Sequence, residues 1–156
     1  MSERFDVVIV GGGMAGMSLG CALAGAAVQT AVIERSDPSS MMSAEFDGRT
    51  TSIAHGSVKV LKGIGLWPLL ASKAQPILDI RVADGHPTRG VSPFFLHYDH
   101  AEVGDDPFGF IIENRTIRNA LSQLAEKTDG LTVITSTAVE ETTRKADGAE
   151  IQLDNG

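Results

Sequence analysis

The sequence contains little of several residue types that mark particular classes of protein. Among its 156 residues there is one cysteine, Cys21, so no intramolecular disulfide can form, which suits a reducing compartment. Only 13 residues are basic against 20 acidic ones, and the net charge of −7 argues against nonspecific nucleic-acid binding. The four histidines are dispersed along the chain, so we predict no metal site.

Long hydrophobic runs are also scarce. The stretch 7–31 is apolar, but a glycine turn interrupts it, which argues against a membrane-spanning helix. No signal peptide is apparent at the N-terminus. A hydrophobic content of 42% is nevertheless enough for one domain with its own core.

The most informative stretch is 5–34. An apolar run at 7–10 predicts a buried parallel strand, and it ends in Gly11-Gly12-Gly13, with Gly16 completing the spacing G-x-G-x-x-G. A helix rich in small residues and a second strand at 28–33 follow, and Glu34 comes directly after that strand. Together these features predict a βαβ unit that binds the adenosine half of a dinucleotide.

A physical reason explains why each of these residue types occurs at its position in the unit. Gly11 permits the tight turn, Gly13 lets a pyrophosphate approach the backbone, and Gly16 lets the helix lie close to the sheet. Met14 and Ala15 begin the helix, where unpaired N–H groups and the positive end of the helix dipole attract phosphate.

An acid at the end of the second strand completes the pattern. Glu34 lies about 20 residues beyond the glycines, where its carboxylate can bind both ribose hydroxyls. Arg35 could instead hold a 2′-phosphate, but the acid beside it makes NADP the poorer fit for this site.

The rest of the chain predicts mixed helices and strands. Asn114 is expected to cap one helix, and the strand at 131–134 should run parallel to the first two. The expected elements are a polar loop at 36–47, helices at 54–64, 66–70 and 115–127, strands at 78–83, 108–112 and 131–134, an irregular region at 85–107 with a short strand at 94–96, and a hairpin of 138–143 with 149–153. An Asn-Gly turn at 155–156 has no strand after it, so we expect these residues to be the N-terminal part of a longer protein.

Several downstream segments carry a family resemblance. DGRTTSIAHGSVKVLKGIGLW, from Asp47, and FGFIIENRTIRNAL, ending at Leu121, resemble the FAD-dependent aromatic hydroxylases, and most of all the ubiquinone-biosynthesis hydroxylases. The resemblance implies an α/β fold, a Rossmann-like FAD-binding domain with glutathione-reductase-like topology and a C-terminal β-hairpin. Residues 1–156 would be its N-terminal part, without the substrate domain and the flavin-side segments.

The resemblance also implies roles for particular residues. The three motif glycines would hold the FAD pyrophosphate, and Glu34 would bind the adenosine ribose. Arg49 would approach the phosphates or the flavin, Arg115 would contact FAD from the start of its helix, and Val139 would place backbone groups near the adenine. The alternatives are a surface Arg49 paired with Asp47 and a solvent-facing Arg115.

The activity implied by the resemblance is aromatic hydroxylation. NAD(P)H would reduce the flavin, O₂ would add to give a flavin hydroperoxide, and a polyprenylated phenol would be hydroxylated. The parent protein would be cytoplasmic, with peripheral contact to the inner membrane or a biosynthetic complex left open. We predict no catalytic acid, base or nucleophile in these residues. The alternatives are a flavin-dependent reductase or halogenase of the same fold, or a noncatalytic dinucleotide-binding module.

Overall fold

A three-stranded parallel sheet combines strands from the N-terminal and C-terminal parts of the chain. The computed structural model describes residues 3–37 and 48–155. The strands are β1 (Val7–Val10), β2 (Thr30–Ile33) and β8 (Leu131–Ile134), in the order β1-β2-β8. Both pairings are parallel, which confirms the predicted βαβ unit and the predicted direction of β8.

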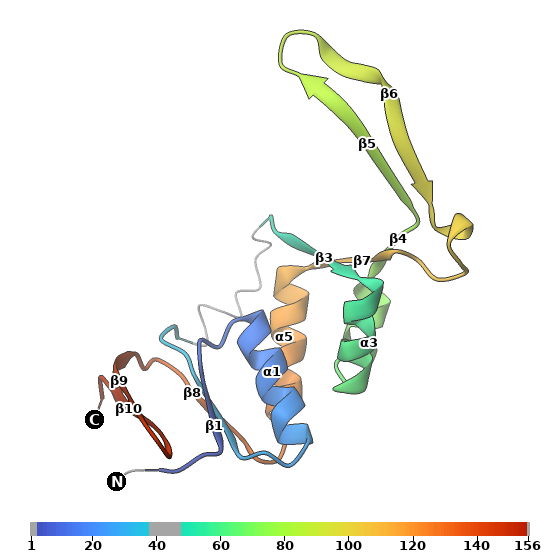
Figure 1. Cartoon of the computed structure of the whole chain (residues 1–156). Helices are drawn as coiled ribbons and strands as arrows, with labels where there is room; N and C mark the ends of the chain where they lie inside the picture. Colours follow the sequence, from blue (N-terminus) through green and yellow to red (C-terminus); the bar gives the residue numbers. More distant parts are fainter. Residues whose placement is uncertain (1–2, 38–47, 156) are drawn as a thin grey trace.

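Two helices pack together beside this sheet. Helix α1 (Met14–Gly25) connects β1 to β2, and α5 (Asn114–Ala125) lies against it (Figure 1). The small residues of α1 allow the close approach that the sequence predicts, since a Cβ on Gly20 would lie 2.8 Å from Val32. All four residues of β2 are buried, so this strand is the centre of the sheet.

A second sheet and two more helices enclose the main apolar core. The strands are β3 (Thr50–Ala54), β7 (Gly109–Glu113) and β4 (Gln75–Ile77), antiparallel in the order β3-β7-β4. Helices α3 (His55–Gly63) and α4 (Trp67–Leu70) follow, with a 3₁₀ turn at Ala71–Lys73. The predicted helices and the strand at 108–112 are confirmed, whereas β3 and β4 were not expected.

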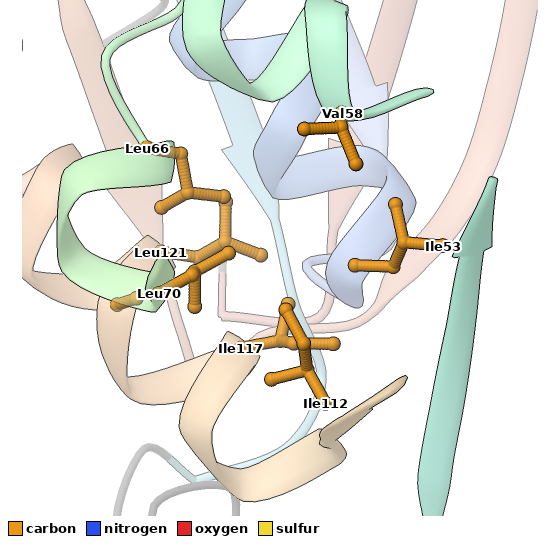
Figure 2. Close-up of a cluster of buried hydrophobic side chains, with 8 residues drawn as sticks. Ile53, Val58, Leu66, Leu70, Ile112, Ile117 and Leu121 are labelled. Atoms are coloured by element: carbon orange, nitrogen blue, oxygen red, sulfur yellow. The ribbon is translucent and has the colours of Figure 1, made fainter. Parts of the chain in front are cut away.

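Buried side chains from these elements converge in one cluster (Figure 2). Val58 of α3 and Leu70 of α4 meet Leu121 of α5 there. The cluster comprises Ile53, Val58, Leu66, Leu70, Ile112, Ile117, Ala120 and Leu121. The Trp67 ring packs edge-to-face on the Phe110 ring, with 4.8 Å between the ring centroids, and both residues pack against the cluster.

Two antiparallel hairpins complete the chain. The hairpin of β5 (Asp79–His86) and β6 (Gly90–Asp99) projects away from the body of the molecule (Figure 1) and is followed by a 3₁₀ turn at His100–Glu102. The expectation of an irregular region at 85–107 is therefore wrong for most of its length. The hairpin of β9 (Val139–Lys145) and β10 (Gly148–Leu153) confirms the prediction.

The predicted cap of α5 is also wrong. Glu113 occupies the N-cap position, and Asn114 is the first helical residue. The Asn114 Oδ1 instead accepts a 2.6 Å hydrogen bond from the Thr51 hydroxyl, which ties α5 to β3. Most of the predicted polar loop, including Asp47, lies outside the described residues. In the described ranges, no helix is long and apolar enough to cross a membrane.

Candidate dinucleotide site

The glycine turn after β1 is shaped by two close backbone approaches. Gly11 has a φ of +108°, which favours glycine, and its N–H donates to the Ile33 carbonyl at 2.8 Å. A Cβ on Gly16 would lie 1.9 Å from the Gly11 carbonyl oxygen, so no side chain fits there. The turn is therefore held against β2 and against the first turn of α1.

Gly13 plays a different part in the same turn. It is the N-cap of α1, with extended backbone at φ −66° and ψ 179°. A Cβ built on it would meet no atom within 4 Å, so the space in front of it is open. Phosphate oxygens can enter this space and meet the first N–H groups of α1, at Met14 and Ala15.

Glu34 bridges the glycine turn and the segment after β2. Its Oε2 accepts from the Gly12 N–H at 2.7 Å, and its Oε1 accepts from the Ser36 N–H at 2.8 Å. The Ser36 backbone N–H is the main cause that lowers the pKa of this carboxyl, with smaller contributions from Gly12 and from the charge of Arg35, partly opposed by burial. Glu34 is therefore ionised at neutral pH, and its carboxylate, which also accepts a hydrogen bond from the Ser36 side chain, has acceptor capacity left for a ribose hydroxyl.

A pocket opens between the glycine turn, α5 and the end of β8. Glu34 lies at the end of β2, and Arg118 reaches the pocket from the opposite helix, α5. The lining residues are Gly12, Gly13, Met14, Met17, Glu34, Arg118, Leu121, Ser122, Val133 and Thr135. The pocket thus brings together three residues expected from the sequence, namely Gly13, Met14 and Glu34.

Gly12 and Arg118 are among the pocket-lining residues that the sequence did not predict. Gly12 occupies a variable position of the glycine motif, yet its N–H binds Glu34, and a Cβ on it would lie 2.7 Å from the Glu34 Cβ. Arg118 lies one turn after Arg115 in α5, and its spacing to Leu121 and Ser122 puts all three on one helix face. That spacing was the signal available in the sequence.

The other expected residues are not among the residues that line this pocket in the described chain. The Arg115 Nε donates to the Glu113 Oε2 at 2.6 Å. Arg35 is exposed beside Glu34, and Arg49 is exposed before β3, where its carbonyl accepts from the Asn114 N–H at 3.1 Å. Val139 begins β9 and is half-buried.

Comparison with known proteins identifies the family of the chain. A family model described as an FAD binding domain matches residues 4–155. The chain belongs to this family. The expected Rossmann-like α/β FAD-binding fold is thereby confirmed, and FAD is the dinucleotide.

Relatives of this FAD-binding chain include ubiquinone hydroxylases. Ubiquinone hydroxylase UbiL of Rhodospirillum rubrum is 41% identical over 151 residues, covering 97% of this chain and 34% of that protein. The 3-demethoxyubiquinol 3-hydroxylase of Escherichia coli is 28% identical over 157 residues, covering 99% of this chain and 39% of that protein. The chain spans about a third of the length of these curated relatives.

Solved structures share the fold at lower identity. The p-nitrophenol 4-monooxygenase PnpA of Pseudomonas putida superposes with a TM-score of 0.75 at 20% identity, covering 98% of this chain and 36% of that one. PqsL of Pseudomonas aeruginosa, described as a probable FAD-dependent monooxygenase, superposes with a TM-score of 0.70 at 15% identity, covering 99% of this chain and 39% of that one. At such identities the similarity shows the fold alone.

The described residues fit an FAD molecule. The space in front of Gly13 is open where a Cβ would stand, next to the start of α1, and ionised Glu34 offers acceptors suited to ribose hydroxyls. Among the described residues, no group of three or more histidine, cysteine, aspartate or glutamate side chains could hold a metal ion.

Proposed function

We propose that this chain is the FAD-binding part of a flavoprotein monooxygenase. The enzyme hydroxylates the aromatic ring of its substrate, a polyprenylated phenol of ubiquinone biosynthesis. The observation that carries the proposal is the 41% identity, over 97% of this chain, to a protein named ubiquinone hydroxylase. The match extends beyond the glycine motif, which many dinucleotide-binding proteins share, through the second sheet and α5.

The residues of the site would hold the adenosine and pyrophosphate end of FAD. Gly13 would leave room for the pyrophosphate at the start of α1, with Met14 and Ala15 supplying N–H groups. Glu34 would accept hydrogen bonds from the ribose hydroxyls.

Four further contacts remain part of the proposal. Arg49 and Arg115 would approach the cofactor from the start of β3 and of α5, and Val139 would offer backbone groups to the adenine. Arg35 would contribute its charge beside the ribose, where it already acts on Glu34.

The reaction would consume NAD(P)H and O₂. Bound FAD supplies the chemistry, because it takes two electrons from the nicotinamide and passes them to O₂. One oxygen atom then forms the new hydroxyl group, replacing a ring hydrogen, and the other leaves as water. A cytoplasmic protein with peripheral membrane contact, alone or in a biosynthetic complex, would suit a polyprenyl substrate, which partitions into lipid.

The test uses the full-length protein. We expect it to purify with bound FAD, and to oxidise NAD(P)H faster when a polyprenylated phenol is added. With isotopically labelled O₂, one labelled oxygen atom should appear in the hydroxylated phenol, as measured by mass spectrometry.

Two results would contradict the proposal. A protein that binds no flavin at saturating FAD would remove the cofactor assignment. NAD(P)H oxidation that yields only hydrogen peroxide with every phenol tested would instead indicate a reductase of the same fold.

A further inference from the structure

The pocket carries opposite charges on opposite walls. In the described part of the chain, its ionisable lining residues are Glu34 at the end of β2 and Arg118 on α5. The Glu34 oxygens accept hydrogen bonds from the backbone N–H groups of Gly12 and Ser36. The positive charge of Arg35 also lowers the pKa of the Glu34 carboxyl. The acid and the arginine therefore enter the pocket from different elements of the fold, the end of β2 and α5.

The position of Arg118 is fixed by the packing of its helix. Ile117 and Leu121, on either side of it in α5, are buried in the main core cluster, and α5 packs against α1. Leu121 and Ser122, three and four residues after Arg118, line the same pocket, so this helix face is turned toward the glycine turn. Arg115, one turn earlier, binds Glu113 through its Nε.

We infer that Arg118 binds the phosphate oxygens of the dinucleotide from the α5 side of the pocket. A guanidinium group presents paired N–H donors that match two phosphate oxygens, and it stays charged at any working pH. The start of α1 faces the same pocket through Gly13 and Met14. The pyrophosphate would then lie between two positive groups, the α1 N-terminus and Arg118. Glu34 would bind the ribose. The inference rests on the proposed FAD binding.

The experiment separates phosphate contacts from contacts to the nucleoside. Dissociation constants for FAD, ADP and adenosine are measured by calorimetry on the flavin-free full-length protein. The variants are Arg118→Gln, Arg118→Lys and a control, Lys127→Gln, which removes one positive charge from an exposed position just beyond α5. Circular dichroism verifies that each variant is folded.

We expect Arg118→Gln to weaken FAD and ADP binding about 10- to 100-fold, the range for a lost hydrogen bond to a charged group. Adenosine binding should stay within about twofold, because adenosine has no phosphate. Arg118→Lys should recover part of the loss, and it also carries the test if the glutamine variant does not fold. The control should bind all three ligands as the wild type does.

The outcomes separate this inference from the proposed function. Wild-type protein that binds neither FAD nor ADP would overturn the proposed function, and the inference with it. Wild-type protein that binds FAD, combined with an Arg118→Gln variant of unchanged ADP affinity, would overturn the inference alone. An equal loss for ADP and adenosine would do so too, because Arg118 would then contact the nucleoside.

Discussion

Replacing Glu34 by glutamine should loosen the glycine turn before any cofactor is involved. The carboxylate accepts two backbone hydrogen bonds, from Gly12 at 2.7 Å and from Ser36 at 2.8 Å. Glutamine keeps one acceptor oxygen, but it places an NH₂ group against the other N–H donor. One charge-assisted bond is therefore lost and the remaining one becomes a neutral bond.

The size of the effect follows from the exposure of the site. A hydrogen bond to a charged group contributes about 1.5–3 kcal/mol, and partial exposure of Glu34 reduces this, so we expect a net loss of about 1–2 kcal/mol. A loss of that size increases the population of locally open turn by about 5- to 30-fold. Hydrogen exchange at the Gly12 and Ser36 amides should accelerate by the same factor in Glu34→Gln.

The matched control is Glu140→Gln, which removes the same charge from an exposed position on β9. It should leave exchange at both amides unchanged. Equal exchange rates in wild type and Glu34→Gln would refute the reasoning, because the two hydrogen bonds would then contribute nothing to the turn. In the full-length protein, Glu34→Ala should also weaken FAD binding, and an unchanged dissociation constant would remove the ribose assignment.

The same carboxylate gives a pH dependence with a definite sign. The pKa of Glu34 is lowered from its ordinary value of 4.5, mainly by the Ser36 N–H. A lowered pKa in the folded state means that the stabilisation is present above the unfolded pKa and is lost as the pH falls through the folded pKa. Thermal melts should therefore show wild type and Glu34→Gln converging as the pH drops from neutral to about 3. A constant difference across that range would contradict this assignment.

Three further predictions concern other parts of the chain. Gly16→Ala should destabilise the protein by about 2–4 kcal/mol in denaturant unfolding, because its Cβ would lie 1.9 Å from a backbone oxygen. The Cβ of Gly13→Ala would meet nothing within 4 Å, so this variant should lose less than about 1 kcal/mol of stability and should mainly weaken FAD binding. Burial raises the pKa of Cys21, so thiol reagents should modify it slowly in the folded protein and rapidly in urea. A hydrogen bond from His97 is the main cause that lowers the pKa of Asp79, so His97→Ala should move the Asp79 titration, followed by NMR, up toward 3.8.

The sequence predicts the elements whose periodicity is local. The strand–glycine–helix–strand order of the first unit is encoded within thirty residues, and the strand at 131–134 is a short apolar run. The helix at 115–127 likewise shows regular apolar spacing, and α5 matches it to within two residues.

The elements that were missed depend on distant partners. Strand β3 begins Thr-Thr-Ser and runs directly into α3, and it becomes a strand by pairing with β7, about 60 residues later. The strands expected at 78–83 and 94–96 are confirmed by β5 and β6, but the full length of the hairpin was missed, because Pro93 and a register shift near Gly85 both argue for irregular structure locally. The hydrogen bond from the Thr51 hydroxyl to Asn114 likewise joins distant residues, and a helix-capping pattern in the sequence does not predict it.

The residues of the candidate site also fall into two groups, those that local spacing predicts and those that depend on distant partners. Glu34 and the motif glycines follow from spacing, because their roles depend on a short continuous unit. The partnership of Gly12 with Glu34 bridges 22 residues, and the approach of Arg118 depends on how α5 packs against α1. Both depend on tertiary packing, which spacing alone does not specify.

The backbone bonds of Glu34 also bear on which dinucleotide the site accepts. A carboxyl of ordinary pKa is already ionised at neutral pH, and the Ser36 and Gly12 N–H groups, which lower the pKa of Glu34 further, also hold its oxygens beside the expected ribose position. An ionised carboxylate would repel a 2′-phosphate, whereas it accepts hydrogen bonds from free hydroxyls. Arg35 is exposed and is not among the pocket-lining residues, and Arg118, the arginine that does line the pocket, is proposed above to bind the pyrophosphate. We therefore expect this site to favour a free ribose over a 2′-phosphate, with two main-chain hydrogen bonds holding the charged carboxylate in place.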